Sequence, residues 1–180
     1  MRIISGQFKG RSVNSHKTFN ARPTTDFARE SLFNILNNYF YFDQIKVLDL
    51  FSGTGSISIE FASRGCTQIE LVESDFKNFQ FINEAMQELG LKFIRTMKGD
   101  AFKYIATCNP GYNVIFADPP YDMEGIEKLP ETIFTRNLLL PEGWFVLEHS
   151  KKYNFKNHPK FHEERKYGAV HFSIFVEDKK

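Results

Sequence analysis

The sequence has only two cysteines, Cys66 and Cys108, among its 180 residues. We therefore expect neither a disulfide framework nor a cysteine-rich zinc cluster, and no metal centre of any other kind is indicated. No apolar run is long enough to span a bilayer. The first eleven residues, MRIISGQFKGR, also lack the apolar core of a signal peptide. Together these absences predict a protein of a reducing compartment, with a cytoplasmic location.

Net charge is almost absent as well, at a formal +1, but the charges are unevenly distributed. Residues 1–25 hold five basic side chains and no acidic one, and residues 150–180 hold eight basic and four acidic ones. The ends therefore carry +5 and +4, which leaves −8 for the rest of the chain. Basic ends around an acidic body favour contact with a polyanion at the ends, although solvated faces of a neutral protein explain the distribution equally well.

Short apolar segments alternate with helical ones from residue 46 onward, within a composition that suits one folded domain. This alternation predicts an α/β fold, with a mostly parallel seven-stranded sheet and helices on both faces. The last two strands flank a tight turn and predict an antiparallel C-terminal hairpin. The expected strands are Val47–Phe51, Ile69–Val72, Phe93–Met97, Val114–Ala117, Trp144–Leu147, Phe161–Tyr167 and Val170–Val176, and the expected helices are Ser56–Arg64, Phe76–Leu89, Ala101–Thr107 and Ile126–Leu139.

A small basic unit precedes this sheet. Apolar residues flank Gly6 and Gly10 in a hairpin-like pattern. Pro23, followed by Thr-Thr-Asp, is a typical helix start. We treat the whole chain as one domain, in which residues 1–22 form a basic β-hairpin arm and residues 23–180 form the core.

The first candidate site is VLDLFSGTGSISIE, residues 47–60, where a strand passes through a glycine turn into a helix. Gly53 and Gly55 allow the backbone to approach a ligand, and the helix N-terminus offers free N–H groups. Position 58 is Ser58, so the full dinucleotide fingerprint G-x-G-x-x-G is absent. The pattern favours a nucleoside-bearing cofactor over the alternative, a glycine turn without a ligand.

Acidic residues end the next two strands. Glu73 lies 24 positions after Asp49, and an acid at about this spacing accepts hydrogen bonds from ribose hydroxyls. We expect Asp75 to cap the following helix instead. Asp100 has two compatible roles: it can accept a hydrogen bond from an adenine amino group, and it can cap the helix that begins at Ala101.

The decisive motif is Asp118-Pro119-Pro120-Tyr121, which follows the fourth strand. Its two prolines fix the backbone and hold a carboxylate and an aromatic ring rigidly at the edge of the sheet. The first and fourth strands of a doubly wound sheet are neighbours, so this motif and the glycine turn should face one crevice. An exocyclic amine on a planar base fits there: the ring stacks on the base, while the carboxylate and a proline carbonyl accept the amine's hydrogens. The alternative is a purely structural Pro-Pro turn.

These motifs together resemble class I S-adenosylmethionine-dependent methyltransferases, in which [DN]-P-P-[YF] is typical of enzymes that methylate planar nitrogen. Three longer stretches, residues 1–11, 22–36 and 164–175, are similar to the bacterial 16S ribosomal RNA guanine-N2 methyltransferases, the RsmD family. The resemblance implies a Rossmann-like fold, S-adenosyl-L-methionine as the cofactor, and methyl transfer to the N2 amine of a guanine in 16S ribosomal RNA. It further implies that this RNA is met within a small-subunit assembly particle, without an obligate protein partner.

The resemblance also implies roles for the matched residues. Asp118 and Pro119 would hold the target amine, with Tyr121 stacked on the base. Basic side chains of the arm would contact RNA phosphates; these are Lys9, Arg11 and Arg22. Four residues match a signature that the family keeps near the catalytic face, and no individual roles are assigned to them; these are Arg22, Thr24, Asp26 and Arg29. The alternative for Arg29 is an ion pair with Glu30 on the helix surface.

For the cofactor, the resemblance implies that Glu73 holds the ribose, while Asp100 and Ala101 hold the adenine. The methionine part is assigned to the end of the first strand and the glycine turn, at Asp49, Ser52, Gly53, Thr54 and Gly55.

Four other functions compete with this interpretation. Methylation of adenine N6 in RNA or DNA is the nearest, because adenine also presents an exocyclic amine, and only the N-terminal stretches argue against it. A protein-glutamine methyltransferase usually has Asn where this chain has Asp118. An oxidoreductase would need the fuller glycine fingerprint, and a non-catalytic ribosome-assembly protein would not need an intact acid at position 118.

Overall fold

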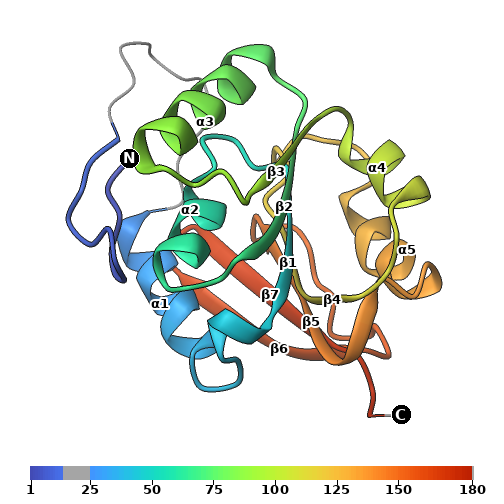
Figure 1. The fold of residues 1–180 in the computed structure, drawn as a ribbon. Helices are drawn as coiled ribbons and strands as arrows, with labels where there is room; N and C mark the ends of the chain where they lie inside the picture. Colours follow the sequence, from blue (N-terminus) through green and yellow to red (C-terminus); the bar gives the residue numbers. More distant parts are fainter. Residues whose placement is uncertain (14–24, 180) are drawn as a thin grey trace.

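A computed structural model describes residues 1–13 and 25–179. One seven-stranded sheet, in the order β3-β2-β1-β4-β5-β7-β6, runs through the molecule with helices on both faces (Figure 1). No helix in the described ranges is long and apolar enough to cross a membrane. The strands are β1 Lys46–Leu50, β2 Gln68–Glu73, β3 Arg95–Lys98, β4 Tyr112–Ala117, β5 Leu139–His149, β6 Phe161–Tyr167 and β7 Val170–Val176. The helices are α1 Asp26–Leu36, α2 Ser56–Ser63, α3 Phe76–Leu89, α4 Ala101–Thr107 and α5 Leu129–Thr135, with short 3₁₀ turns η1 Phe42–Gln44 and η2 Ile126–Lys128.

The sheet is parallel from β3 to β5, and β7 pairs antiparallel with both β5 and β6. The chain builds β1, β2 and β3 outward in one direction, then crosses back to place β4 on the other side of β1. This reversal is the switch point at which doubly wound sheets bind their ligands. The structure confirms the predicted α/β fold with its antiparallel C-terminal hairpin.

Two hydrophobic cores lie on opposite faces of the sheet. Val47 points into the core under α1, α2 and α3, and its neighbour Leu48 points into the core under α4 and α5. Successive side chains of a strand point to opposite faces, so a strand covered on both faces must be apolar at nearly every position. This is why the central strands appear in the sequence as continuous apolar runs.

Two predicted boundaries are wrong. The helix expected over residues 126–139 is only the short turn η2 followed by α5, because Asn137 takes a left-handed backbone (φ 50°) and Leu139 already pairs with β4. The third strand begins at Arg95 rather than Phe93, whose ring is exposed. The other predicted helices and strands occur where the sequence places them, apart from small differences at their ends and a longer β5.

Residues 1–13 are bound tightly to α2. Glu60, which is buried on α2, accepts hydrogen bonds from the backbone N–H groups of Ile4 at 2.9 Å and Ser5 at 3.0 Å. A Cβ at Gly6 would lie 1.8 Å from the carbonyl oxygen of Ser63, so only glycine fits this contact. Long-range contacts of this kind make the segment part of the folded domain.

The expected N-terminal hairpin is also not a ladder of strands. A single antiparallel bridge joins Arg2 to Ser12, while Ile3 and Val13 are buried in the core under α1–α3. The two ends of the segment do pair as in a hairpin, because the N–H of Ile3 donates to the carbonyl of Arg11 at 3.0 Å and the N–H of Val13 donates to that of Met1 at 2.9 Å. The pairing does not extend into a ladder, because the N–H groups of Ile4, Ser5 and Phe8 donate to side chains of α2 instead.

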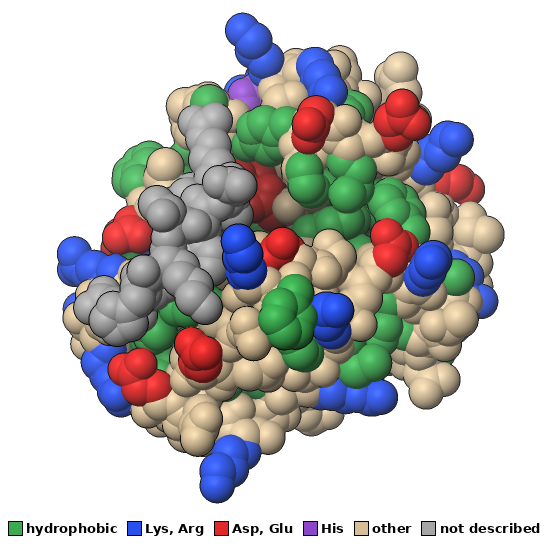
Figure 2. Space-filling view, turned by 90° about the horizontal axis from the view of Figure 1, so that it is seen from above, with side chains coloured by type: hydrophobic (Ala, Val, Ile, Leu, Met, Phe, Trp, Pro, Cys, Tyr) green, Lys and Arg blue, Asp and Glu red, His purple; other side chains and the backbone are tan. Residues whose placement is uncertain are grey.

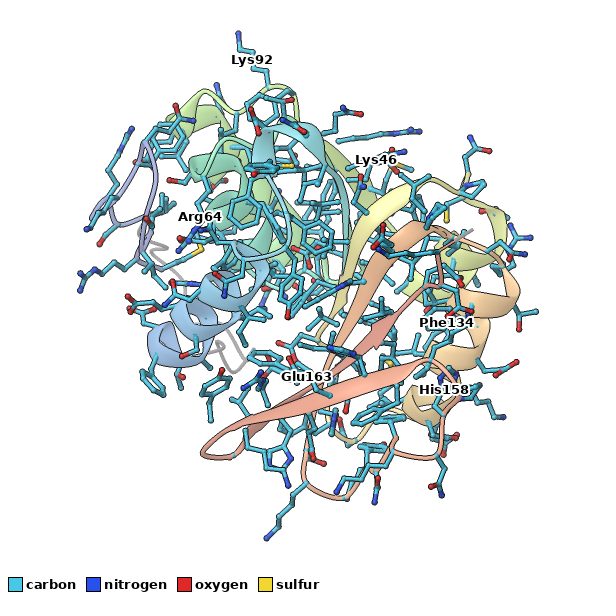
Figure 3. The ribbon with its side chains drawn as sticks, turned by 90° about the horizontal axis from the view of Figure 1, so that it is seen from below. Lys46, Arg64, Lys92, Phe134, His158 and Glu163 are labelled. Atoms are coloured by element: carbon cyan, nitrogen blue, oxygen red, sulfur yellow. The ribbon has the colours of Figure 1, made fainter. Side chains whose placement is uncertain are left out.

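A polar cluster lies near the amino edge of the sheet, on the side where Figure 3 labels Lys46. Glu70 accepts hydrogen bonds from the hydroxyls of Tyr104 and Tyr112, both at 2.6 Å, and pairs with Lys46 at 3.1 Å. The hydrogen bonds and the ion pair of Glu70 therefore hold the fold together. The acidic residues that line a cavity lie at the opposite, carboxyl edge of the sheet.

Candidate active site

A cavity of about 480 Å³ opens at the carboxyl edge of the sheet, at the switch point between β1 and β4. Figure 2 looks onto this edge and shows acidic side chains in a hollow bordered by hydrophobic ones. None of the lining residues that the structure describes is basic, while five carry carboxylates. These are Asp49, Glu73, Asp75, Asp118 and Glu148. The lining therefore favours a ligand that is cationic or rich in hydrogen-bond donors.

Asp49 ends β1 under the glycine turn and is 1% exposed. Its Oδ2 accepts hydrogen bonds from the hydroxyl (2.6 Å) and the backbone N–H (3.2 Å) of Ser58, so it caps α2 from a neighbouring strand. Its Oδ1 is buried and has no hydrogen-bond partner among the described residues. Burial, helped by the charge of Glu73, raises the pKa of Asp49 to about 7. Asp49 thus presents an unsatisfied acceptor at the cavity wall.

The glycine turn is held open by unusual backbone angles. Phe51, Gly53 and Gly55 all have positive φ, at 58°, 55° and 73°. The Ser52 hydroxyl donates to the carbonyl of Asp49 at 2.9 Å, which fixes the turn against β1. These angles bring successive backbone groups of the turn to the cavity wall rather than into a regular helix.

Glu73, at the end of β2, clamps this turn from the other side. Its Oε2 accepts from the N–H of Gly53 at 2.6 Å and its Oε1 from the N–H of Asp75 at 2.7 Å. Burial raises the pKa of the carboxyl group. The Asn78 side chain also donates to this carboxylate. A carboxylate has about four acceptor positions, so three donors leave capacity for a ligand.

The two predicted helix caps are confirmed. Asp75 accepts from the N–H of Asn78 at 2.9 Å, and Asp100 accepts from the N–H of Lys103 at 2.8 Å. Asp100 and Ala101 do not line the cavity, nor does Gly55. The cavity does bring together the other expected cofactor residues, which are Asp49, Ser52, Gly53, Thr54 and Glu73.

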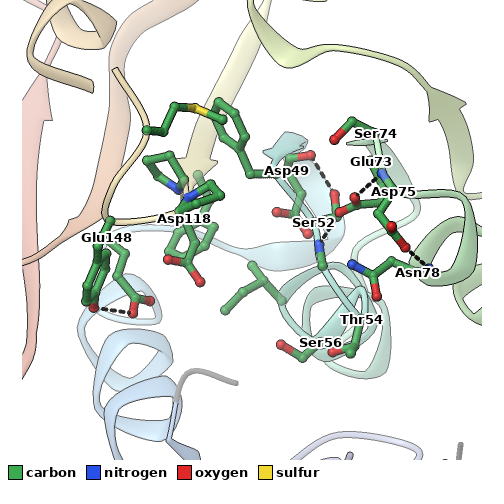
Figure 4. Close-up of a pocket in the computed structure, with 18 residues that line it drawn as sticks. Asp49, Ser52, Thr54, Ser56, Glu73, Ser74, Asp75, Asn78, Asp118 and Glu148 are labelled. Carbon is green, nitrogen blue, oxygen red and sulfur yellow. Dashed lines mark hydrogen bonds between the residues drawn. The ribbon is translucent and has the colours of Figure 1, made fainter. Parts of the chain in front are cut away.

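All four residues of the Asp118-Pro119-Pro120-Tyr121 motif line the same cavity, facing the glycine turn (Figure 4). The N–H of Asp118 lies 3.4 Å from the carbonyl oxygen of Leu50, so the motif begins directly beside the end of β1. The predicted meeting of the two motifs in one crevice is therefore confirmed.

Sequence reasoning missed Glu148, a carboxylate at the end of β5 that is 3% exposed and lines the cavity. It accepts a hydrogen bond from the Tyr121 hydroxyl at 3.2 Å. The sequence pattern could have revealed it, because Glu148 directly follows an apolar run, as Glu73 does. Apolar lining residues were missed as well; these are Phe51, Ile57, Phe116 and Met123.

Two of the three residues assigned to RNA lie outside the cavity lining. Lys9 and Arg11 are exposed on the N-terminal loop, away from the cavity. Arg22 and Thr24 lie outside the described residues. Arg29 is buried on α1, where it pairs with Asp26 at 2.9 Å and donates to the carbonyl of Arg2.

The alternative pairing of Arg29 with Glu30 is therefore wrong, because the guanidinium of Arg29 turns inward and Glu30 is exposed. Burial lowers the pKa of Arg29. This side chain anchors the first residues of the chain to α1 and does not line the cavity.

Comparison with known proteins agrees with this site. A family model described as Conserved hypothetical protein 95 matches residues 1–176. The Bacillus subtilis (strain 168) protein YlbH is 36% identical over 156 residues, which cover 84% of this chain and 84% of that protein. Ribosomal RNA small subunit methyltransferase D of Escherichia coli (strain K12) is 34% identical over 148 residues, which cover 82% of this chain and 71% of that protein.

Solved structures share the whole fold. The Escherichia coli protein yhhF superposes with a TM-score of 0.87 at 26% identity, over 100% of this chain and 99% of that one. An RNA methyltransferase from Salinibacter ruber, in complex with S-adenosyl-L-homocysteine, gives a TM-score of 0.68 at 15% identity, over 88% of this chain and 95% of that one, and this shows the fold alone. The chain belongs to the Conserved hypothetical protein 95 family, that of ribosomal RNA small subunit methyltransferase D, as its motifs predicted.

Proposed function

We propose that this chain transfers a methyl group from S-adenosyl-L-methionine to the N2 amine of a guanine in 16S ribosomal RNA. One observation carries the proposal: the glycine turn and the Asp118 motif open into a single acidic cavity. Membership in the family of ribosomal RNA small subunit methyltransferase D supports the same substrate. The Salinibacter ruber enzyme, which has the same fold, supports the cofactor.

The cavity suits this cofactor in size, charge and donor placement. Its volume of about 480 Å³ lies within the usual range for small-molecule sites. S-adenosylmethionine supplies a methyl group already activated on a positively charged sulfonium, and it also carries an ammonium. The unpartnered Oδ1 of Asp49 is a suitable acceptor for that ammonium.

The remaining cofactor assignments are proposals of the same kind. Ser52, Gly53 and Thr54 would contact the methionine part, and the remaining acceptor capacity of Glu73 would serve the ribose. Asp100 and Ala101 would contact the adenine from the start of α4, beyond the residues that line the cavity.

The Asp118 motif would activate the target amine by positioning and electrostatics. The Asp118 carboxylate and the Pro119 carbonyl would accept the two amine hydrogens, which makes the nitrogen lone pair more available for attack. The nitrogen becomes cationic as the methyl group arrives, and Asp118 stabilises that charge before the proton leaves. Tyr121 would hold the base by stacking on it.

The target guanine would have to be unpaired or flipped out, because its amine is hidden inside a helix. Lys9, Arg11 and Arg22 would then bind phosphates around it. A small-subunit assembly particle in the cytoplasm is the setting that this substrate implies, and no obligate protein partner is required.

The test is to delete the gene and map methylated nucleotides in the small-subunit RNA of the deletion strain. We expect one N2-methylguanine to disappear and to return when the wild-type gene is restored. Loss of an N6-methyladenine instead would support the adenine alternative, and an unchanged methylation map would reject the proposal.

A further inference from the structure

Glu148 is a buried carboxylate that the chemistry above does not use. It is 3% exposed at the end of β5 and lines the cavity on the side of Asp118, opposite Glu73 (Figure 4). A buried carboxylate at the wall of a binding cavity is a candidate for contact with the ligand.

The sheet register places Glu148 beside the target amine. Ala117 on β4 is paired with Leu147 on β5, so Asp118 and Glu148 are the next residues on two adjacent parallel strands. Neighbouring strands lie about 4.8 Å apart. The two carboxylates thus leave the same edge of the sheet from adjacent positions, and both line the cavity.

Tyr121 fixes the direction in which Glu148 faces. The hydroxyl of this ring donates to Oε1 of Glu148 at 3.2 Å. A hydroxyl lies in the plane of its ring, so the carboxylate sits at the rim of the ring. A base stacked on Tyr121 would therefore present an edge, rather than a face, toward Glu148.

Guanine and adenine differ at that edge. Guanine has two adjacent hydrogen-bond donors, the N2 amine and N1–H. In adenine the N6 amine is a donor, but the adjacent N1 is an acceptor. We propose that Glu148 selects guanine by accepting a hydrogen bond from N1–H while Asp118 and Pro119 hold the N2 amine. Adenine in the same pose would place the N1 lone pair against a carboxylate, which is repulsive. This inference rests on the proposed function and names the residue that sets its base specificity.

The test compares two target bases in small subunits assembled with RNA that carries either guanine or 2-aminopurine at the mapped nucleotide. 2-Aminopurine keeps the N2 amine but has no N1–H. We expect wild-type kcat/KM to be at least tenfold higher for guanine, because sites built around a hydrogen bond reject analogues that lack it. Glu148→Gln should reduce that ratio to near one, because its amide can donate to N1 of 2-aminopurine.

Two variants separate this role from others. Asp122→Asn removes a charge from an exposed residue nearby that does not line the cavity, and it should keep the wild-type ratio. Tyr121→Phe removes the hydroxyl that orients Glu148, so it should lower the ratio without making the two bases equal. If Glu148→Gln lowers kcat/KM for both bases by the same factor, Glu148 acts only by positioning Tyr121 and the proposal is wrong.

Three further outcomes decide the matter. Wild-type enzyme that methylates both bases equally would overturn the proposal, whatever the stability of the variants. Glu148→Gln that keeps a tenfold preference for guanine would overturn it as well. Wild-type enzyme that methylates no guanine would instead overturn the proposed function, so the two failures are distinguishable.

Discussion

Replacing Asp49 by Asn should make the protein more stable and a poorer binder of its proposed cofactor. Asp49 is buried, and one of its oxygens has no partner among the described residues. The substitution keeps the shape of the side chain and an oxygen that can accept from Ser58. It removes the buried negative charge, which is the feature that we assign to the ligand's ammonium.

The magnitude follows from the pKa of Asp49, which burial raises from 3.8 to about 7. Between these pH values the unfolded chain has lost a proton that the folded chain keeps, so the free energy of unfolding falls as pH rises. One pKa unit corresponds to about 1.36 kcal/mol, so the wild type loses about 2–3 kcal/mol between pH 5 and pH 8 through this group. The Asn variant avoids that loss.

The assay is urea denaturation of both proteins at pH 5 and pH 8. The stability gained by Asp49→Asn should be about 2–3 kcal/mol larger at pH 8 than at pH 5. Any cost of burying the introduced amide is the same at both pH values and cancels. An equal effect at the two pH values would refute the reasoning about the buried charge.

Calorimetry with S-adenosylmethionine tests the second half of the prediction. The wild type should bind more weakly below pH 7, by up to about tenfold per pH unit, because binding an ammonium requires the ionised carboxylate. Asp49→Asn should bind at least tenfold more weakly at pH 8 and show no such pH dependence. Unchanged affinity in the variant would move the ammonium site elsewhere.

Three further predictions concern the rest of the site. Glu73→Ala should lower S-adenosylmethionine affinity at least tenfold, since charge-assisted hydrogen bonds contribute about 1.5–3 kcal/mol each; unchanged binding in calorimetry would exclude a ribose contact. Tyr121→Ala should raise KM for RNA by the loss of stacking, about 1–3 kcal/mol, whereas Tyr121→Phe should be mild. The double change of Lys9 and Arg11 to Ala should reduce the slope of log RNA affinity against log salt concentration by about 1.4–1.8 units, without changing cofactor affinity. An unchanged slope would indicate that the loop packs on α2 without binding RNA.

The parts of the fold that depend on neighbouring residues were predictable from sequence. Thr25 and Asp75 cap α1 and α3 because a short polar side chain at the first turn can accept a free N–H, and that requires only local geometry. The central strands were equally clear, because burial on both faces leaves them mostly apolar. The meeting of the glycine turn with the Asp118 motif followed from topology rather than from side-chain detail.

The remainder depends on contacts between distant parts of the chain. Glu60 binds the N–H groups of Ile4 and Ser5, which lie more than fifty positions away, and no local pattern encodes that contact. Glu148 joins the site through the pairing of β5 with β4, and it meets the hydroxyl of Tyr121 there. The role of Asp49 as a cap for α2 likewise needs the strand and the helix to be in place first.

The central claim is that Asp118 acts on the target amine in this cavity. The most direct measurement is single-turnover transfer of tritiated methyl groups from S-adenosylmethionine to small subunits of the deletion strain, by the wild type and by Asp118→Ala. We predict that the variant binds the cofactor with nearly wild-type affinity and loses most of the rate of methyl transfer to guanine N2. Wild-type transfer rates in Asp118→Ala would contradict the account.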